Sequence, residues 1–592
     1  MSQINDSRRL YLDQKNDLAD LVIELLEELQ IDVVFGIPGG SIEPLFDAMA
    51  RSSRRGGLRP VVARHETGAA FMAEGYHRET GKIGVCCSTT GPGATNLITG
   101  VSSAYVAQIP LLVITAQTAL PLFGKLTLQE SSCSSINTVE MFRCCTRYSS
   151  LISHRGQLEE KFIAAFTAMK GTPSGPVHLS IPTDILTAPR RMGSRRSLLK
   201  LETITQRPKT LDPEALSALL TEVKQAQQMV LLLGDGCGHG IQDIMTFAEK
   251  NNVRIVTGPA GKRWIDHCHP LYYGVVGYAG HASADEVLED PGNDLVLAVG
   301  TRLGEMIFSG RRDDIQLNKK LIHIDNNPEH FSQSLLARLH VCGAVDKIFS
   351  ALNQQLPDQR QDESCYTPSV RGENPNIVVD DCAAYVSSST PIKPQRLMRE
   401  LSLKVLADYR IFIDAGNSWA WATHYLHLSS SNRCHIEMGF GAMTWAIGNS
   451  VGSAVGAPGT PTLCITGDGS YLMSGQELTV AVAEKLPLVF VILNDSNLGM
   501  VMHGQRLGGG EPIAFELPPV DFAQVARSMG AEAETVRTID ELEALDFIAM
   551  GKRSGPTVVD VYIDPQEVPP MGARMKTLGR AEQNKVNVVE TA

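Results

Sequence analysis

The chain has 592 residues, of which 43% are hydrophobic and 20% are charged, and its formal net charge is −12. This length suits several domains, and we expect three. The acidic balance and the absence of a long basic run argue against nucleic acid as a partner. No apolar run approaches the ~20 residues that a membrane helix needs, and the N-terminus lacks the apolar core of a signal peptide. We therefore expect a cytoplasmic protein that does not bind membranes.

Residues 14–185 alternate between helix-like and strand-like segments. Residues 18–29 have apolar side chains at helical spacing, and residues 32–40 form an apolar strand that breaks at glycines. Residues 82–105 predict a strand, a glycine-proline turn and a helix, and residues 109–116 predict another buried strand. Such alternation is typical of βα units around a parallel sheet, with ligands at the carboxyl ends of the strands.

Two polar connections divide the rest of the chain into two further α/β blocks. The connections are expected at 189–202 and 356–392. The predicted strands lie near residues 229–236, 252–258, 294–303 and 320–328 in the second block, and near 410–416, 461–469, 486–495 and 556–564 in the third. The fold class that we predict is α/β, with three doubly wound parallel-sheet domains. Their expected ranges are 1–188, 203–355 and 393–570, with a tail at 571–592.

The third block carries a distinctive pair of strand ends. Asp468 stands between Gly467 and Gly469 at the tip of an apolar strand, and a helix is expected near 475–485. A second buried strand ends at Asp495, which lies 27 residues further on, followed by Asn497. Oxygen ligands from two neighbouring strand ends suit Mg²⁺, which prefers a few protein oxygens together with phosphate oxygens. The alternative interpretation is two unrelated turns in which Asp caps the next helix.

A Gly-Asp-Gly motif followed about 25–30 residues later by an asparagine-containing turn resembles the thiamine diphosphate binding motif. Residues 14–570 resemble the acetohydroxyacid synthase (acetolactate synthase) branch of the thiamine diphosphate enzymes. The stretches that carry the resemblance are 34–48, 65–81, 88–100 and 438–455. The resemblance implies a pyrimidine-binding domain, a central nucleotide-binding-like domain and a domain that binds thiamine diphosphate and Mg²⁺, in chain order.

The resemblance also implies roles for individual residues. Glu66 matches the glutamate that activates the cofactor through its aminopyrimidine ring, although an acid in a first helical turn can also be a simple cap. Met443 matches the bulky residue that holds the two cofactor rings in a V shape. Gly40 and Gln129 match residues near the reacting centre. The remaining expected cofactor residues are Asn417, Ser418, Gly441, Gly467, Gly469, Ser470 and Met500, and the expected Mg²⁺ ligands are Asp468, Asp495 and Asn497. At position 495 the family usually carries asparagine.

Two positions depart from the family in the part of the site that receives the acceptor. Met306 aligns with an arginine that meets the acceptor carboxylate near the flavin, and Gly504 aligns with a tryptophan. A methionine cannot pair with a carboxylate, so the acceptor or the side chain of the donor is expected to differ. His503, beside this gap, is either a proton-transfer residue or a solvated loop histidine. FAD is a candidate second cofactor, because the central domain resembles the nucleotide-binding core of the family.

The function that the resemblance implies is a carboligase. It would decarboxylate a 2-oxo acid, in the first place pyruvate, and transfer the acyl carbanion to a second carbonyl compound. The alternatives are a 2-hydroxyacyl-CoA lyase, a 2-oxo acid decarboxylase and a regulatory homologue without activity. Because the family glutamate acts on cofactor held by a neighbouring subunit, the resemblance also implies a homodimer or homotetramer with active sites at subunit interfaces.

Overall fold

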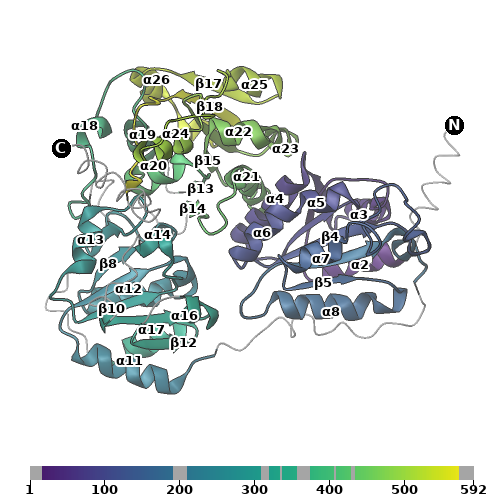
Figure 1. Cartoon of the computed structure of the whole chain (residues 1–592), viewed down its shortest axis with the longest axis horizontal. Helices are drawn as coiled ribbons and strands as arrows, with labels where there is room; N and C mark the ends of the chain where they lie inside the picture. Colours follow the sequence, from purple (N-terminus) through teal and green to yellow (C-terminus); the bar gives the residue numbers. More distant parts are fainter. Residues whose placement is uncertain are drawn as a thin grey trace.

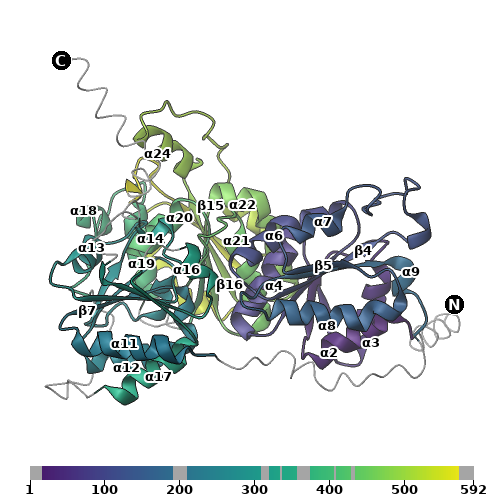
Figure 2. The ribbon, with the colours of Figure 1, turned by 60° about the horizontal axis from the view of Figure 1, so that its bottom comes forward.

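The computed structural model describes residues 16–190, 210–308, 319–333, 337–356, 374–405, 408–428 and 434–572. It contains three α/β regions, each built on a six-stranded sheet with helices on both faces (Figures 1 and 2). Most of the first predicted connection, 189–202, and all but two residues of the predicted tail, 571–592, lie outside the described residues. Within the described residues, no helix combines the length and the apolar character needed to cross a membrane.

The first region contains a parallel sheet in the order β2-β1-β3-β4-β6-β5. Its inner strands are buried along their whole length, which explains the apolar runs of β1, β3 and β4. The strands are β1 (Val33–Gly36), β2 (Arg59–Val62), β3 (Gly84–Ser88), β4 (Leu111–Gln117), β5 (Tyr148–Leu151) and β6 (Val177–Pro182). The helices are α2 (Leu18–Glu28), α3 (Glu43–Arg54), α4 (Glu66–Thr80), α5 (Pro92–Asn96), α6 (Ile98–Val106), α7 (Thr138–Arg143), α8 (Leu158–Met169) and α9 (Thr183–Leu186).

The central region has the strand order β12-β11-β10-β7-β8-β9, which in chain order is the 3-2-1-4-5-6 arrangement of dinucleotide-binding folds. Its strands are β7 (Met229–Leu233), β8 (Arg254–Thr257), β9 (Tyr272–Val275), β10 (Leu295–Val299), β11 (Leu321–Asp325) and β12 (Leu339–Cys342). Its helices are α11 (Pro213–Gln225), α12 (Ile241–Lys250), α13 (Ala282–Glu289), α14 (Glu305–Phe308), α16 (Glu329–Gln333) and α17 (Val345–Gln355). The short α18 (Cys382–Tyr385) lies in the predicted second connection.

The third region repeats the topology of the first. Its order is β14-β13-β15-β16-β18-β17, so both sheets run 2-1-3-4-6-5 in chain order. The strands are β13 (Arg410–Ile413), β14 (Cys434–Ile436), β15 (Thr462–Gly467), β16 (Leu488–Asn494), β17 (Glu532–Val536) and β18 (Thr557–Tyr562). The helices are α19 (Pro394–Lys404), α20 (Asn417–Tyr425), α21 (Trp445–Gly456), α22 (Asp468–Ser474), α23 (Leu478–Ala483), α24 (Gly499–Leu507), α25 (Phe522–Ser528), α26 (Ile539–Ala544) and α27 (Phe547–Met550). The three parallel sheets confirm the predicted fold class.

Helix α4 of the first region packs directly on α21 of the third (Figure 2). The helices approach so closely that a Cβ at Gly75 would lie 2.0 Å from the carbonyl oxygen of Asn449, and one at Gly452 would lie 1.9 Å from that of Met72. Only glycine permits such a backbone approach. The apolar core is continuous across this contact, so the first and third regions share one hydrophobic cluster.

Candidate active site

A cavity of about 1220 Å³ lies between the central and third regions, with a few residues of the first region at its edge. Its wall contains the carboxyl ends of β7 and β10 and those of β13 and β15. In each sheet these two strands stand where the chain order reverses, which is the usual ligand position in open α/β sheets. The carboxyl edges of the central sheet and of the third sheet therefore face the same cavity.

The carboxylate of Asp468 ties the ends of β15 and β16 together. It accepts hydrogen bonds from the backbone N–H of Gly469 and from that of Ser496, both at 2.7 Å. The helix expected near 475–485 is α23, and a further helix, α22, precedes it and begins at Asp468 itself. Asp468 is therefore the first residue of α22, where unpaired N–H groups favour negative charge.

Asp468, Asp495 and Asn497 all line the cavity, as the sequence predicted for a shared site. Burial raises the pKa of Asp468 to about 6. Burial, and then the neighbouring Asp468, raise the pKa of Asp495 to about 7. Two neighbouring carboxylates, one buried and one half-buried, that disfavour their own charge are a donor set that a bound cation would stabilise.

The side chain of Asn417, at the start of α20, lies close to that of Asp495. A Cβ at Gly499 would lie 2.6 Å from Nδ2 of Asn417 and 3.0 Å from Oδ2 of Asp495, so these two side chains converge on one glycine. Oδ1 of Asn417 is buried and has no hydrogen-bond partner among the described residues. Asn417 therefore offers an unused oxygen beside the carboxylate of Asp495.

These residues fit Mg²⁺ and a diphosphate. The described residues contain no cluster of three or more His, Cys, Asp or Glu side chains suited to a metal, so the protein would supply two carboxylates and amide oxygens. Mg²⁺ is commonly held in that way, with phosphate oxygens and water completing its octahedron. The N-terminal ends of α20 and α22 both open on the cavity and offer backbone N–H groups to an anion.

The two predicted serines are already engaged through their hydroxyls. Ser418 Oγ donates to the backbone oxygen of Asp414 at 2.7 Å, and Ser470 Oγ donates to the Asp414 carboxylate. Each serine would therefore meet a diphosphate through its backbone N–H rather than its hydroxyl. Asp414 is a residue that sequence reasoning missed, although it stands at the end of a strand that was predicted.

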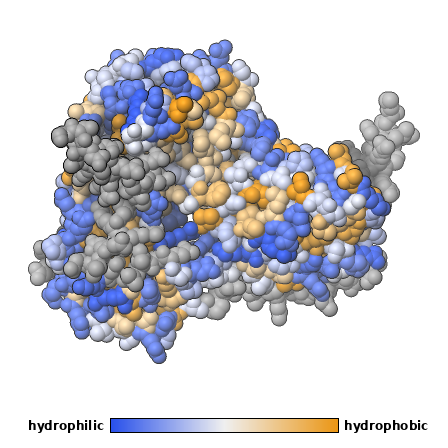
Figure 3. Space-filling model, viewed as in Figure 1, coloured by the Kyte–Doolittle hydropathy of each residue, from blue (hydrophilic) through white to orange (hydrophobic). Residues whose placement is uncertain are grey.

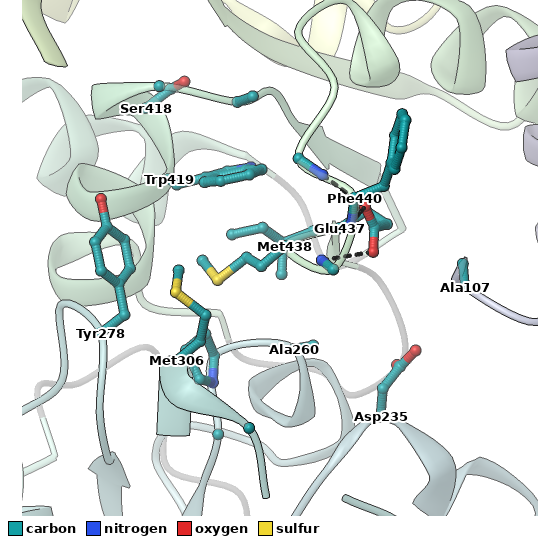
Figure 4. A pocket seen from close by; sticks show the side chains of 18 of the residues that line it. Ala107, Asp235, Ala260, Tyr278, Met306, Ser418, Trp419, Glu437, Met438 and Phe440 are labelled. Atoms are coloured by element: carbon teal, nitrogen blue, oxygen red, sulfur yellow. Dashed lines mark hydrogen bonds between the residues drawn. The ribbon is translucent and has the colours of Figure 1, made fainter. Parts of the chain in front are cut away.

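One wall of the cavity is apolar (Figure 4). Tyr278 and Met306 of the central region and Trp419 and Met438 of the third surround the same part of it, and Asp235 lies on the opposite side. All four belong to, or pack on, one hydrophobic cluster. Met443, Met500, Gly441, Gly467 and Gly469 also line the cavity.

Glu66, Gly40 and Gln129 lie outside this cavity lining, in a second cluster around the turn that follows β3. The Glu66 carboxylate accepts a hydrogen bond from Nδ2 of Asn96 at 2.9 Å. A Cβ at Gly93 would lie 3.2 Å from Oε1 of Glu66, and one at Gly91 would lie 3.0 Å from the Gln129 Cβ. The structure thus brings the expected residues together in two clusters, one in the first region and one between the other two.

His503 and Gly504 also lie outside the cavity lining, although Met306 is part of it. His503 is buried in α24, so it is not a solvated loop histidine. A Cβ at Gly504 would meet nothing within 4 Å, so the position opens on empty space. Of the three positions expected in the substrate pocket, only Met306 faces the cavity of this chain.

Comparison with known proteins supports this description. Three family models match: the thiamine pyrophosphate enzyme N-terminal TPP binding domain at residues 16–137, the central domain at 216–352 and the C-terminal TPP binding domain at 414–561. A Mycobacterium tuberculosis protein described as "Putative acetolactate synthase large subunit IlvB2" is 30% identical over 573 residues, covering 93% of this chain and 98% of the relative. The acetolactate synthase isozyme 2 large subunit of Escherichia coli is 29% identical over 573 residues, covering 95% and 99%.

A solved structure shares the fold. It is described as "X-ray structure of a putative thiamin diphosphate-dependent enzyme isolated from Mycobacterium smegmatis", and the match has a TM-score of 0.76 at 22% identity. The match covers 93% of this chain and 100% of that one. The three-region architecture is therefore common to both proteins.

Proposed function

The chain belongs to the thiamine pyrophosphate enzymes and is acetolactate synthase-like, and on this premise we propose that it is a thiamine diphosphate-dependent carboligase. It would decarboxylate a 2-oxo acid, in the first place pyruvate, and transfer the acyl unit to a second carbonyl compound. The observation that carries the proposal is the convergence of Asn417, Asp468 and Asp495 at the strand ends of the third region. A 2-hydroxyacyl-CoA lyase or a 2-oxo acid decarboxylase would use the same residues, so the reaction products must distinguish the three activities.

Each cluster has a part in this chemistry. Asp468, Asp495 and Asn497 would hold Mg²⁺, and the starts of α20 and α22 would hold the diphosphate. Bound thiamine diphosphate would supply a nucleophilic thiazolium carbon, and its positively charged ring would take up the electron pair of the C–C bond that breaks when CO₂ leaves. Glu66 would exchange a proton with the aminopyrimidine nitrogen, and Met443 would support the bent cofactor from below. The apolar wall around Trp419 would exclude water from the reacting carbon.

Met306 is the residue that we expect to affect the choice of acceptor. Because a thioether cannot form an ion pair, Met306 itself offers no charge to a carboxylate. We propose that the carbonyl compound bound there differs from the 2-oxo acid acceptors of the acetolactate synthases. Methionine also adapts to ligands of different shape, which suits a large or apolar substituent.

We propose that two copies of the chain assemble so that Glu66 of one copy meets the cavity of the other. The separation of Glu66 from the cavity within one chain supports this arrangement. Exposed apolar residues support it too. Leu126 and Leu128, beside Gln129, are 97% and 88% exposed, and α22 exposes Leu472 and Met473. Apolar side chains gather where the third region adjoins the first (Figure 3), and such surface is usually covered in an assembly. A homotetramer would contain the same pair.

We also propose FAD as a ligand of the part of the cavity that the central region lines. The ends of β7 and β10 carry Gly234, Gly236 and Gly300, which line the cavity and pack backbone against backbone: a Cβ at Gly234 would lie 2.3 Å from the carbonyl oxygen of Gly300. Arg302 lines the same part. Glycine strand ends with an arginine beside them suit the phosphates of a dinucleotide. The absorption spectrum of the purified protein tests for bound flavin.

Product analysis tests the function. Purified protein would be incubated with thiamine diphosphate, Mg²⁺ and a panel of 2-oxo acids, with and without aldehydes, and the products identified by mass spectrometry. A carboligase releases CO₂ and forms products that contain both the acyl unit and the acceptor. Aldehyde as the only organic product would indicate a decarboxylase. Turnover in a parallel incubation with a 2-hydroxyacyl-CoA, but with none of the 2-oxo acids, would indicate the lyase.

A further inference from the structure

The loop that carries Met443 joins β14 to α21 and is held at its start by one carboxylate. Glu437 accepts hydrogen bonds from the backbone N–H of Gly439 at 2.7 Å and from that of Phe440 at 3.1 Å (Figure 4). A third bond comes from the N–H of Gly441 at 3.3 Å. Glu437 is only 9% exposed, so these bonds are largely shielded from water. The first half of the loop therefore has a fixed path.

The other end of the loop is a strained residue. Thr444 directly follows Met443 and has φ 74° and ψ −3°, which is the left-handed region. A β-branched side chain rarely adopts this conformation, because its Cβ crowds the backbone. Such a conformation persists only where the surrounding structure enforces it, and it is found most often at functional sites.

The bonds that enforce this conformation come from Asp414 and Ser470. The Thr444 N–H donates to Oδ2 of Asp414 at 3.2 Å and to Oγ of Ser470 at 2.8 Å. Asp414 is fully buried at the end of β13. Its carboxylate also accepts bonds from Thr466 Oγ1 at 2.9 Å and from the Ala446 N–H at 3.2 Å. One carboxylate thus joins the end of β13, the end of β15 and the start of α21.

We infer that Asp414 and Thr444 are positioning residues that fix Met443 beneath the cofactor. The inference rests on the proposed function, in which Met443 supports the two cofactor rings. Thr444 leaves the backbone few alternative conformations, whereas glycine would relieve the strain and let the loop move. Neither residue needs to touch the cofactor, because both act through the direction in which the Met443 side chain leaves the backbone.

Replacing Thr444 separates positioning from folding. Thr444→Gly should leave the melting temperature unchanged or higher, because the left-handed strain is gone. The deuterium exchange rate at C2 of bound thiamine diphosphate should fall about 10- to 100-fold, as expected for a misplacement of about 1 Å. The dissociation constant of the cofactor should change by less than about threefold, because the diphosphate contacts remain. Thr444→Asn should keep the exchange rate, since asparagine tolerates the left-handed region.

A second readout does not depend on activity. Hydrogen–deuterium exchange mass spectrometry of peptides covering residues 437–446 should show exchange at least about tenfold faster in Thr444→Gly. Asp414→Asn should have the same effect, because its amide nitrogen must face an N–H donor in either orientation, that of Thr444 or that of Ala446. Lys485→Gly is the matched control: Lys485 also has a positive φ, of 54°, but lies in an exposed turn after α23, so neither readout should move.

Two results would overturn the inference. One is Thr444→Gly with wild-type protection of residues 437–446, which would show that Thr444 does not hold the loop. The other is a loosened loop with an unchanged C2 exchange rate, which would show that the loop does not position the cofactor. If the wild-type protein shows no exchange at C2 at all, the proposed function fails and the cofactor part of the inference fails with it, whereas the protection of these amides still decides whether Thr444 holds the loop.

Discussion

Oε1 of Glu477 accepts a hydrogen bond from the backbone N–H of His65 at 2.9 Å, which joins the third region to the residue before Glu66. Oε2 accepts a second bond from the N–H of Arg64 at 3.0 Å. Glu477 is fully buried, so both bonds are made away from water. The turn that presents Glu66 is thus anchored on the segment that follows Asp468 and α22.

This contact makes the stability of the protein depend on pH. Burial raises the pKa of Glu477 to about 7, from 4.5 in an unfolded chain. Between pH 4.5 and about 7 the folded protein binds more protons at Glu477 than the unfolded chain does. The contribution of Glu477 to the free energy of unfolding therefore falls as the pH rises through this range, and it stays constant above about pH 7. The fall is at most about 3 kcal/mol. Glu477→Gln should flatten this part of the profile in urea titrations, and the exposed Glu534→Gln should not. Identical profiles for all three proteins would remove Glu477 from this role.

Glu66→Gln should keep thiamine diphosphate binding but abolish activation of the cofactor. The glutamine cannot exchange a proton with the aminopyrimidine ring, while the metal and diphosphate contacts lie in the other cluster. Deuterium exchange at C2 of the bound cofactor measures the effect. Glu140→Gln, which alters an exposed glutamate, serves as the control. An exchange rate in Glu66→Gln equal to that of the wild type would exclude Glu66 from the mechanism.

Asp468→Ala should abolish Mg²⁺-dependent binding of thiamine diphosphate. The variant removes one of two carboxylates and also frees the Ser496 N–H that fixes the end of β16. We expect the affinity for cofactor to fall at least about 100-fold, since even indirect losses at metal sites reach 10–100-fold. Titration calorimetry with and without Mg²⁺ provides the measurement. Unchanged affinity would contradict the assignment of the metal site.

Two glycines of α24 provide a matched pair. In Gly499→Ala the new Cβ would lie 2.6 Å from Nδ2 of Asn417 and 3.0 Å from Oδ2 of Asp495, so both side chains must move. Cofactor binding should weaken at least about tenfold. In Gly504→Ala the new Cβ meets nothing within 4 Å, so cofactor binding should not change. Equal affinities in the two variants would mean that Asn417 and Asp495 do not bind the cofactor.

Met306→Arg should shift acceptor choice toward compounds that carry a carboxylate. The new cation would stand in the cavity wall, whereas Gly504→Trp would fill space outside the cavity of this chain. The ratio of kcat/KM values for a 2-oxo acid and an aldehyde acceptor should change about 10- to 200-fold in Met306→Arg. Competition assays read by mass spectrometry measure the ratio, with the partly exposed Met141→Arg as control. An unchanged ratio would show that Met306 does not set acceptor choice.

The sequence predicted the inner strands better than the edges of the sheets. The six edge strands β2, β5, β9, β12, β14 and β17 were not among the expected strands. They are short, and β2, β5 and β17 are partly exposed, so they lack the continuous apolar runs that reveal buried parallel strands. The buried β6 was missed because His178 and Ser180 interrupt its apolar pattern.

The residues of the candidate site were predictable from the sequence where they form a motif within a few positions of one another. Acids at the ends of apolar strands revealed Asp468, between two glycines, and Asp495, in an asparagine-rich turn, because strand and motif are adjacent in sequence. Asp414 was missed because its partners Thr444 and Ser470 are 30 and 56 residues away, which no local pattern reveals. The division of the expected residues into two clusters also required the structure, since it depends on how the first region packs on the third.

Mixing two inactive variants tests most directly whether the Glu66 cluster of one chain and the Asp468 cluster of another form one active site. Glu66→Gln and Asp468→Ala would each be purified, mixed under conditions that exchange subunits, and assayed for CO₂ release from pyruvate with thiamine diphosphate and Mg²⁺. In a mixed dimer one of the two sites has both native residues, so activity should return to about a quarter of the wild-type value after random exchange. If native mass spectrometry shows mixed dimers and no activity returns, the two clusters do not act together across chains.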